Sequence, residues 1–285
     1  VPISISVDIG KVQWASWVSN EKILASVETA NLTKIKHFVR TDRFLALFDW
    51  TGEKQEILSS PDVVDFLIDD PDHILVRKGT SFIKLNLVTK EEAIMPGRDV
   101  RYRNVVTDKD HNVRFATSNS RGFSVIDQNF TAYYRKTIES EWRELYDFDV
   151  SLGLGKKTKK VQERPFTFEG FTNDPNIIYI SKKDDNKNNS LFTYHVDTKK
   201  TVEKIATHEK YDLYSFGFDK ENNLDYYYYF DGRTHVVYLG EHGQKLNKIL
   251  STSFPDTNAQ IQSASKDKKK YIVRVSSPTD PGTFY

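Results

Sequence analysis

A short run of β-branched and aromatic residues, followed by a polar turn and a second such run, recurs six times along the chain. Asp, Asn and Pro end strands because their side chains bond locally or because φ is fixed, while the flanking residues suit a pleated surface. Each pair of runs therefore predicts a β-hairpin. The six pairs are Trp14–Val18 with Ile23–Val27, Val64–Leu67 with Ile74–Val76, Tyr102–Val106 with Val113–Phe115, Phe166–Phe171 with Ile177–Ile180, Leu213–Phe218 with Leu224–Tyr228, and Ile261–Ala264 with Tyr271–Val275.

The spacing of these hairpins is nearly regular. Their turns begin at positions 19, 69, 108, 173, 219 and 266, which are 50, 39, 65, 46 and 47 residues apart. Repeats of about 40–50 residues are typical of the four-stranded blades of a β-propeller. The one longer separation predicts an insertion between the third and fourth units.

A second hairpin is expected between successive first hairpins, which makes four strands per unit. Its first strand precedes a polar turn in five places: Phe44–Phe48 before 49–52, Phe82–Leu87 before 88–90, Phe123–Ile126 before 127–129, Leu191–Val196 before 197–199, and His235–Leu239 before 240–243. No segment keeps an apolar 3.6-residue period over about 11 residues, and the charged stretch 137–145 comes nearest to a helix. The sequence thus predicts an all-β β-propeller with six hairpin units, the last of which ends before its outer strands.

The composition excludes several classes of function. The 41 Lys and Arg residues nearly cancel the 40 Asp and Glu residues, so no net field steers the protein to nucleic acid or to an anionic membrane. The absence of cysteine excludes disulfides, thiolate nucleophiles and cysteine-ligated metal centres. No stretch approaches the roughly 20 apolar residues of a membrane span.

The closing segment resembles a known family. Residues Ser263–Tyr285 look like the last propeller blade of serine peptidases of the prolyl oligopeptidase family, in particular of its acylaminoacyl-peptidase-like members. The order and spacing of earlier pieces agree with that group over most of the chain, although individual blade motifs are degenerate. These pieces are Val100-Arg101 leading to Asp108 and Val113-Arg114, Trp142 with Leu145, and His208–Asp212.

The resemblance implies that residues 1–285 form a single propeller domain of a larger enzyme. A first blade would precede Val1, giving seven blades in the full domain, and an α/β-hydrolase domain would follow Tyr285. The ends of the chain agree with this expectation, because Val1 is not an initiator Met and Phe284-Tyr285 has neither a polar tail nor a helix cap.

The family's catalytic Ser, Asp and His lie in the hydrolase domain, where the Ser occupies a Gly-x-Ser-x-Gly turn. No such pentapeptide occurs in this sequence. The nearest string, Arg121–Ile126, lacks the second glycine and lies in a predicted strand, so we interpret Ser124 as structural. The chain is therefore predicted to carry no catalytic, metal-binding or cofactor-binding residue of its own, and to need no cofactor.

The role implied for the propeller is to cover the hydrolase active site, so that folded proteins are excluded while short peptides enter. The expected partners are the hydrolase domain of the same polypeptide and short peptide substrates. Two other functions stay open: a free-standing propeller scaffold for protein interactions, and a propeller enzyme with central acidic or metal-bound residues. The lysine- and asparagine-rich sequence favours a periplasmic or secreted bacterial protein.

Two acidic segments are candidate cation sites. Asp108–Asn112 begins like a calcium loop, but Val113 stands where such a loop needs Gly and Asn119 where it needs Glu. We interpret it as a hairpin turn, and likewise Asp69–His73, for which a surface cation site is the alternative. The histidines lack the i, i+4 spacing of a helical zinc site, although clustering in space stays open. They are His37, His73, His111, His195, His208, His235 and His242.

Basic and aromatic runs complete the candidates. Lys156–Lys160 follows Gly153-Leu154-Gly155, and a single basic run without interleaved aromatics is typical of a solvated loop. The two glycines lack the strand–glycine–lysine–helix order of a phosphate loop. The rings of Tyr226–Phe230 alternate faces on a strand and are expected to pack against both neighbouring blades, with a peptide-stacking shelf as the alternative. The residues expected in the inter-blade core are Trp14, Trp17, Trp50 and Trp142.

Overall fold

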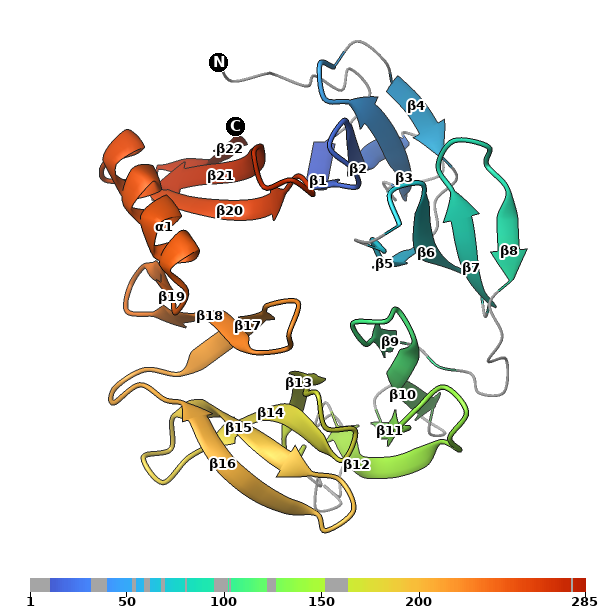
Figure 1. The fold of residues 1–285 in the computed structure, drawn as a ribbon, viewed down its shortest axis with the longest axis vertical. Helices are drawn as coiled ribbons and strands as arrows, with labels where there is room; N and C mark the ends of the chain where they lie inside the picture. The colour runs from blue at the N-terminus through green and yellow to red at the C-terminus, as the bar shows by residue number, and fades with distance from the viewer. Residues whose placement is uncertain are drawn as a thin grey trace. The chain divides into compact units, whose positions relative to one another are not determined.

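The computed structural model describes residues 11–31, 40–52, 55–58, 62–67, 70–79, 81–94, 102, 104–121, 127–151, 164–277 and 279–285. These residues form 22 β-strands and one helix, and the strands make six antiparallel sheets (Figure 1). The sheets belong to two compact units, Val1–Arg98 with Leu250–Tyr285, and Asp99–Ile249. The predicted all-β β-propeller with antiparallel blades is confirmed, and six blades are found.

The first unit contains three sheets, each built from strands that are consecutive in the chain. The first has β1 (Lys11–Trp17), β2 (Lys22–Asn31), β3 (Arg40–Asp49) and β4 (Gln55–Leu58). The second has β5 (Asp62–Asp65), β6 (His73–Lys78), β7 (Ser81–Asn86) and β8 (Glu92–Ile94). The last has β20 (Asn258–Ala264), β21 (Tyr271–Ser277) and β22 (Asp280–Phe284). The final unit of the sequence therefore has one outer strand, β22, that the sequence does not predict.

The second unit also contains three sheets of consecutive strands. One has β9 (Asn104–Thr107), β10 (Val113–Arg121), β11 (Asp127–Tyr134) and β12 (Arg143–Ser151). The next has β13 (Thr167–Phe171), β14 (Ile177–Lys183), β15 (Asn189–His195) and β16 (Lys200–Ala206). The third has β17 (Leu213–Phe218), β18 (Leu224–Phe230) and β19 (Thr234–Tyr238), after which the helix α1 (Glu241–Ser253) begins.

A register shift typical of a β-bulge lies between the first and second strand of every sheet. In β1 it falls between Val12 and Trp14, and in β13 between Phe168 and Gly170. The other four sheets show it in the same strand pair. A bulge bends its strand and increases the local twist. The recurring bulge is a structural repeat that no sequence motif predicts.

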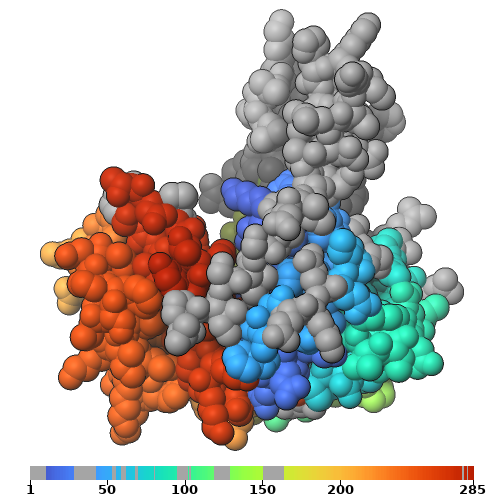
Figure 2. Space-filling view, turned by 90° about the horizontal axis from the view of Figure 1, so that it is seen from above, coloured from blue at the N-terminus to red at the C-terminus, as the bar shows by residue number. Residues whose placement is uncertain are grey.

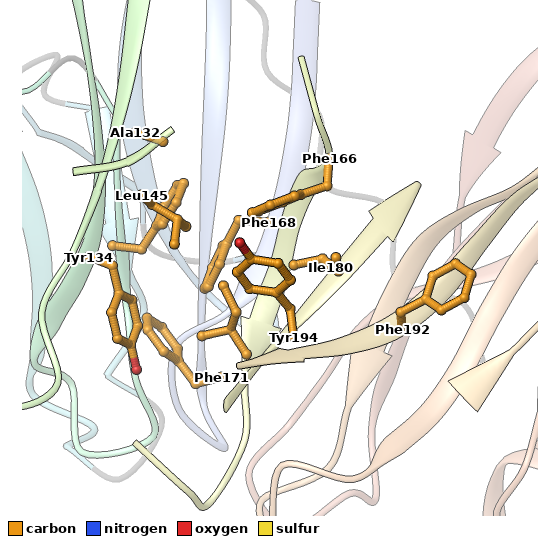
Figure 3. Close-up of a cluster of buried hydrophobic side chains, with 11 residues drawn as sticks. Ala132, Tyr134, Leu145, Phe166, Phe168, Phe171, Ile180, Phe192 and Tyr194 are labelled. Carbon is orange, nitrogen blue, oxygen red and sulfur yellow. The ribbon is translucent and has the colours of Figure 1, made fainter. Parts of the chain in front are cut away.

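Apolar side chains pack between neighbouring sheets of the same unit. In the second unit, Phe115 of β10 stacks on Phe168 of β13, with ring centroids 4.0 Å apart and planes at 7°. They belong to a buried cluster supplied by β10 to β15 (Figure 3). In the first unit, Trp14 contacts Phe66 edge to face, which confirms its predicted place between blades. Each fully buried aromatic contributes about 1.5–3 kcal/mol, so these borders stabilise the sheets.

Three hairpin loops share one hydrogen-bond pattern. They start at Asp108, Asp184 and Asp219, and in each the first N–H donates to the fifth carbonyl at 2.9 Å. The Asp carboxylate accepts the N–H groups of the third and fifth residues, at distances from 2.8 to 3.2 Å. The fourth residue has positive φ, with values of 63° for His111, 64° for Lys187 and 59° for Asn222. The predicted turn at Asp108 is thus confirmed.

The polar segment 127–129 differs from the prediction. The sequence predicts a turn there, but the structure places all three residues in β11. The exposed amide of Asn129 donates across the sheet to Asp149 of β12 at 3.0 Å, which gives a polar residue a partner within a strand. The strand predicted at Phe123–Ile126 lies outside the described residues.

The helix α1 is also absent from the sequence prediction, which expects a hairpin after the turn at 240–243. Its apolar residues Leu246, Ile249 and Leu250 span only two turns, so they give too short a period to recognise. Gly243 allows the helix to approach β19, because a Cβ atom there would lie 2.4 Å from the ring of Tyr238.

We expect Lys187→Val to lower the free energy of unfolding by about 1–2 kcal/mol, because a β-branched residue opposes positive φ. The measurement is urea unfolding followed by circular dichroism. Lys220→Val is the matched control, since Lys220 is an exposed loop residue that is not among those with positive φ, and its substitution should change the value by less than about 0.5 kcal/mol. Equal changes in both variants would contradict the loop geometry.

Candidate functional site

A cavity of 360 Å³ lies where the ends of β11 and β12 meet the β15–β16 turn, within the second unit. Figure 1 shows β12 beside the sheet of β13 to β16. The lining of the cavity combines three apolar side chains with six charged ones. The lining residues are Tyr134, Leu145, Val196, Lys136, Glu141, Arg143, Glu144, Asp197, Lys199 and Ser140.

Tyr134 forms the most rigid part of the lining. Its side chain is buried in the core cluster together with Leu145, as Figure 3 shows. The Tyr134 hydroxyl accepts a hydrogen bond from Arg114 Nη2 at 2.6 Å and donates one to the carbonyl of Pro175 at 2.7 Å. Burial raises the pKa of Tyr134, so the phenol is neutral at physiological pH.

The guanidinium of Arg114 ties this network together. It donates to the carbonyl of Arg135 at 3.2 Å and to Asp108 Oδ2 at 3.3 Å, and its charge lies over the ring of Phe171 at 4.9 Å. The Arg114 and Asp108 side chains are only 10% and 7% exposed. Because the buried charges are paired, the network can hold the Tyr134 ring in place without an unpaired ion.

Asp197 organises the charged side of the cavity. Its carboxylate binds Lys136 Nζ at 2.6 Å and Arg143 Nη1 at 3.2 Å. The hydrogen bond from Lys136 lowers the pKa of Asp197, an effect that the charge of Arg143 reinforces, so Asp197 is ionised at neutral pH. Lys199 belongs to the same turn and has a φ of 54°.

The lining places charged groups beside apolar ones. The aliphatic hydroxyl among the described lining residues, that of Ser140, is hydrogen-bonded to Thr137 Oγ1 at 2.9 Å. Charged groups that converge beside apolar side chains can orient a small ligand. The cavity is therefore a candidate binding site.

A second candidate region is the border between the first and last sheets, here called the seam and defined by β1 and its turn against β20 and β21. Figure 2 shows the blue N-terminal strands next to the red C-terminal ones, and β1 contacts both β20 and β21. Ser263 Oγ lies 3.0 Å from Ser16 Oγ and accepts the N–H of Trp17 at 3.0 Å. Within the described residues, the two sheets share no strand and no backbone-to-backbone hydrogen bond.

The turns flanking the seam add polar contacts. Asn20 Oδ1 accepts the N–H of Asp267 at 3.0 Å, and the Asn20 carbonyl accepts a hydrogen bond from Lys270 Nζ at 2.8 Å. The Lys270 ammonium also lies 4.3 Å from the ring centre of Trp50 and 5.6 Å from that of Trp17. The buried indole N–H of Trp17 has no hydrogen-bond partner among the described residues, so hydration on opening would favour the separated state.

The tryptophan predictions have mixed outcomes. Trp17 is buried between the first and last sheets with Ile272, as expected. The prediction for Trp50 is wrong, because its side chain is 38% exposed at a turn, where it receives the Lys270 cation. Trp142 contacts Tyr102 and Arg135, which flank β9 and β11 of the sheet that Trp142 itself leads into, so these contacts lie inside one blade.

Several sequence candidates lie outside the described residues: Ser124, His37, Gly153, Gly155 and the basic run Lys156–Lys160. In the aromatic run, Tyr226 contacts Tyr238 and Tyr229 stacks on His235, both within the same sheet. Tyr229 also contacts the rings of His208 and Tyr211, which lie on the connection between β16 and β17. The run therefore packs within its own sheet and against the segment that leads in from the preceding one.

The turn at Asp70 is an ion-pair cluster. Its carboxylate binds His73 Nδ1 at 2.8 Å and Lys84 Nζ at 2.6 Å. Burial alone would raise the pKa of Asp70, but the hydrogen bonds from Lys84 and His73 outweigh it and lower the pKa to about 2. His235 pairs in the same way with Asp231 at 2.7 Å. Within the described ranges, no three His, Asp or Glu side chains are placed to hold a metal ion.

Sequence reasoning identified neither the cavity nor the seam. Lys136 and Asp197 are 61 residues apart, and Ser16 and Ser263 are 247 apart, so no local pattern joins them.

The helix in the described part of the chain is too short or too polar to cross a membrane.

We expect Tyr134→Phe to lower the free energy of unfolding by about 1–3 kcal/mol, because Arg114 and the Pro175 carbonyl would each lose a buried partner. Urea unfolding gives the value. Tyr214→Phe is the control, since the Tyr214 hydroxyl donates to Thr234 at an exposed position and its loss should cost less than about 0.5 kcal/mol. If the two variants unfold alike, the Arg114 network does not hold the ring.

No family model matches the sequence, and no curated protein sequence matches it. Among solved structures, the fold is similar to acylaminoacyl peptidase of Pyrococcus horikoshii, with 12% identity, 97% of this chain and 51% of that chain covered, and a TM-score of 0.49. It is also similar to the β-propeller domain of the Trilobed protease from Pyrococcus furiosus, with 9% identity, 97% and 95% coverage and a TM-score of 0.45. A third is TolB from Acinetobacter baumannii, with 11% identity, 96% and 54% coverage and a TM-score of 0.36.

This chain spans about half the length of the acylaminoacyl peptidase that it resembles. At these identities the similarity is one of fold, and it transfers no activity.

Proposed function

We propose that this chain is the non-catalytic propeller of a serine peptidase of the prolyl oligopeptidase family. In this role it covers the active site of an α/β-hydrolase domain in the same polypeptide and restricts substrates to short peptides. The sequence supports the proposal through the resemblance of Ser263–Tyr285 to a last blade and through the lack of any Gly-x-Ser-x-Gly turn. The first blade before Val1 belongs to the same proposal.

The seam is the observation that carries the proposal. A cover must admit substrate, and a border with few buried apolar residues, like that of Trp17, Ile23 and Ile272, opens more readily than one with many. Each of its hydrogen bonds contributes about 0.5–1.5 kcal/mol, and the ladder of neither sheet is broken when they separate. Opening at Ser16 and Ser263 would let a peptide enter from the side, while the closed sheets exclude a folded protein.

The first test compares this chain with a longer one that continues through the coding sequence after Tyr285. We expect only the longer chain to cleave short blocked peptides, because the catalytic groups lie outside residues 1–285. A serine-reactive phosphonate should abolish that cleavage. If the longer chain is inert and no phosphonate labels it, the peptidase proposal fails and a free-standing interaction scaffold takes its place.

The second test locks the seam. In the longer chain, Ser16→Cys with Ser263→Cys should form a disulfide on oxidation, since the two hydroxyl oxygens are 3.0 Å apart. We expect the oxidised form to cleave a blocked decapeptide about tenfold more slowly, with recovery on reduction, because entry requires opening.

Ser16→Cys alone is the control for this test, because residues 1–285 contain no cysteine with which it could pair. It should respond to neither oxidation nor reduction. Equal decapeptide cleavage by the locked and reduced double variant would rule out the seam as the entrance, even if the longer chain proves to be a peptidase.

A further inference from the structure

The cavity beside Tyr134 holds charges that its own lining leaves unpaired. Asp197 neutralises one charge of the pair Lys136 and Arg143. Within the described residues, Lys199 makes no ion pair, and neither does Glu141 or Glu144, although all three line the cavity. Three cations and three carboxylates thus surround one small volume, with one carboxylate shared between two of the cations.

Two of the cations can receive a further carboxylate. Arg143 is 70% exposed and uses one of its five N–H donors on Asp197. Lys199 lines the cavity from the turn that also carries Asp197. A ligand carboxylate can therefore bind Arg143 in a charge-assisted, two-point contact while Asp197 keeps Lys136.

The unpaired carboxylates can receive an ammonium group. Glu141 precedes β12 and Glu144 is its second residue, so Trp142 and Arg143 stand between them in the chain. Both side chains belong to exposed residues and keep their acceptors available. A ligand with both charges could therefore contact both sets of groups, whereas an anion or a cation alone could contact only one.

Size and floor restrict the ligand further. The volume of 360 Å³ is near the lower end of the range of about 300–1,000 Å³ for pockets that bind small molecules. Tyr134, Leu145 and Val196 supply apolar surface, and Tyr134 is held by Arg114 and the Pro175 carbonyl. The cavity therefore combines apolar side chains, one of them fixed by two hydrogen bonds, with charged ones, which suits a compact ligand with a small apolar side chain.

We propose that this cavity binds a short peptide through both of its free ends, with the α-carboxylate at Arg143 and Lys199 and the α-ammonium at Glu141 and Glu144. The two opposite charges and the apolar floor come from the cavity itself. The choice of a peptide among small zwitterions rests on the proposed function, for which peptides of this size are substrates or products.

The test uses residues 1–285 as they are, with the dipeptide Ala-Leu as the probe, titrated by isothermal calorimetry and by NMR. We expect saturable binding that weakens about tenfold when the probe is N-acetylated, and about tenfold when its C-terminus is amidated, because each change removes one charged contact. Free acetate and methylammonium together should not reproduce the binding, since neither reaches both ends.

Paired variants assign the two ends. Arg143→Gln with Lys199→Gln should weaken Ala-Leu about tenfold and leave the affinity for its amide unchanged, while Glu141→Gln with Glu144→Gln should do the same for the N-acetyl probe. Lys220→Gln with Lys245→Gln is the matched control, because it removes two exposed charges of the same unit away from the cavity. Thermal unfolding of each variant confirms that it is folded.

The proposal is overturned if the unaltered chain shows no saturable binding, or if the control pair weakens Ala-Leu as much as the cavity pairs do. Neither outcome bears on the peptidase proposal, because no hydrolase domain takes part. Binding that is intact in a protein whose longer chain is inert would instead leave a zwitterion site and remove only the reason for choosing a peptide.

Discussion

The structure depends on burial between neighbouring sheets. A sheet of three or four strands has little core of its own, so its apolar face must lie against the next sheet. The stacked rings of Phe115 and Phe168 show this within the second unit, and the fully buried Ile178 and Ile180 of β14 lie in the same cluster. The borders between sheets, more than the sheets themselves, therefore determine stability and also where the molecule can hold a ligand or open.

The cavity follows from the way such a border ends. Tyr134 and Leu145 belong both to the core cluster and to the cavity lining, so the cavity continues the apolar border outward. Just beyond Tyr134 and the end of β15, the side chains become charged, with Lys136 on one strand end and Asp197 on the other turn. Arg114 and Asp108, which lie beside Tyr134, pair with each other. The core therefore meets the charged lining without leaving an unsatisfied buried ion.

The hairpins were predictable because their signal is local. Asp108 and Asp219 each organise a turn through their own carboxylates, and the residues on either side alternate as strands require. The two failures have different causes. The polar segment 127–129 lies in a strand because Asp149, 20 residues away, supplies a partner that the neighbouring residues do not reveal. The helix α1 replaces a predicted hairpin, and its few apolar residues give too short a period to recognise.

The same reasoning explains why the candidate sites were not predicted. The ion pairs of Asp197 and the hydroxyl contact of Ser16 with Ser263 join residues that are distant in sequence and ordinary in type. Serine, lysine and aspartate on turns are common, and only the fold selects the few that meet. The sequence therefore predicts the class of fold and contains no Gly-x-Ser-x-Gly turn. The residues of the cavity and the seam can be found only from the contacts between sheets.

Within the first unit, the first sheet has two borders of very different composition. Among the described residues, ten buried apolar side chains form the cluster that joins it to the second sheet, whereas the cluster at the seam has three, Trp17, Ile23 and Ile272. Because apolar burial sets most of the free energy of such a border, the seam is the weaker of the two by composition alone. When the seam opens, its polar groups can form hydrogen bonds with water. Water offers no such replacement for the apolar contacts of the larger cluster. By this composition, any conformational opening of the first sheet would begin at Ser16 and Ser263, where side chains make the contacts with the last sheet.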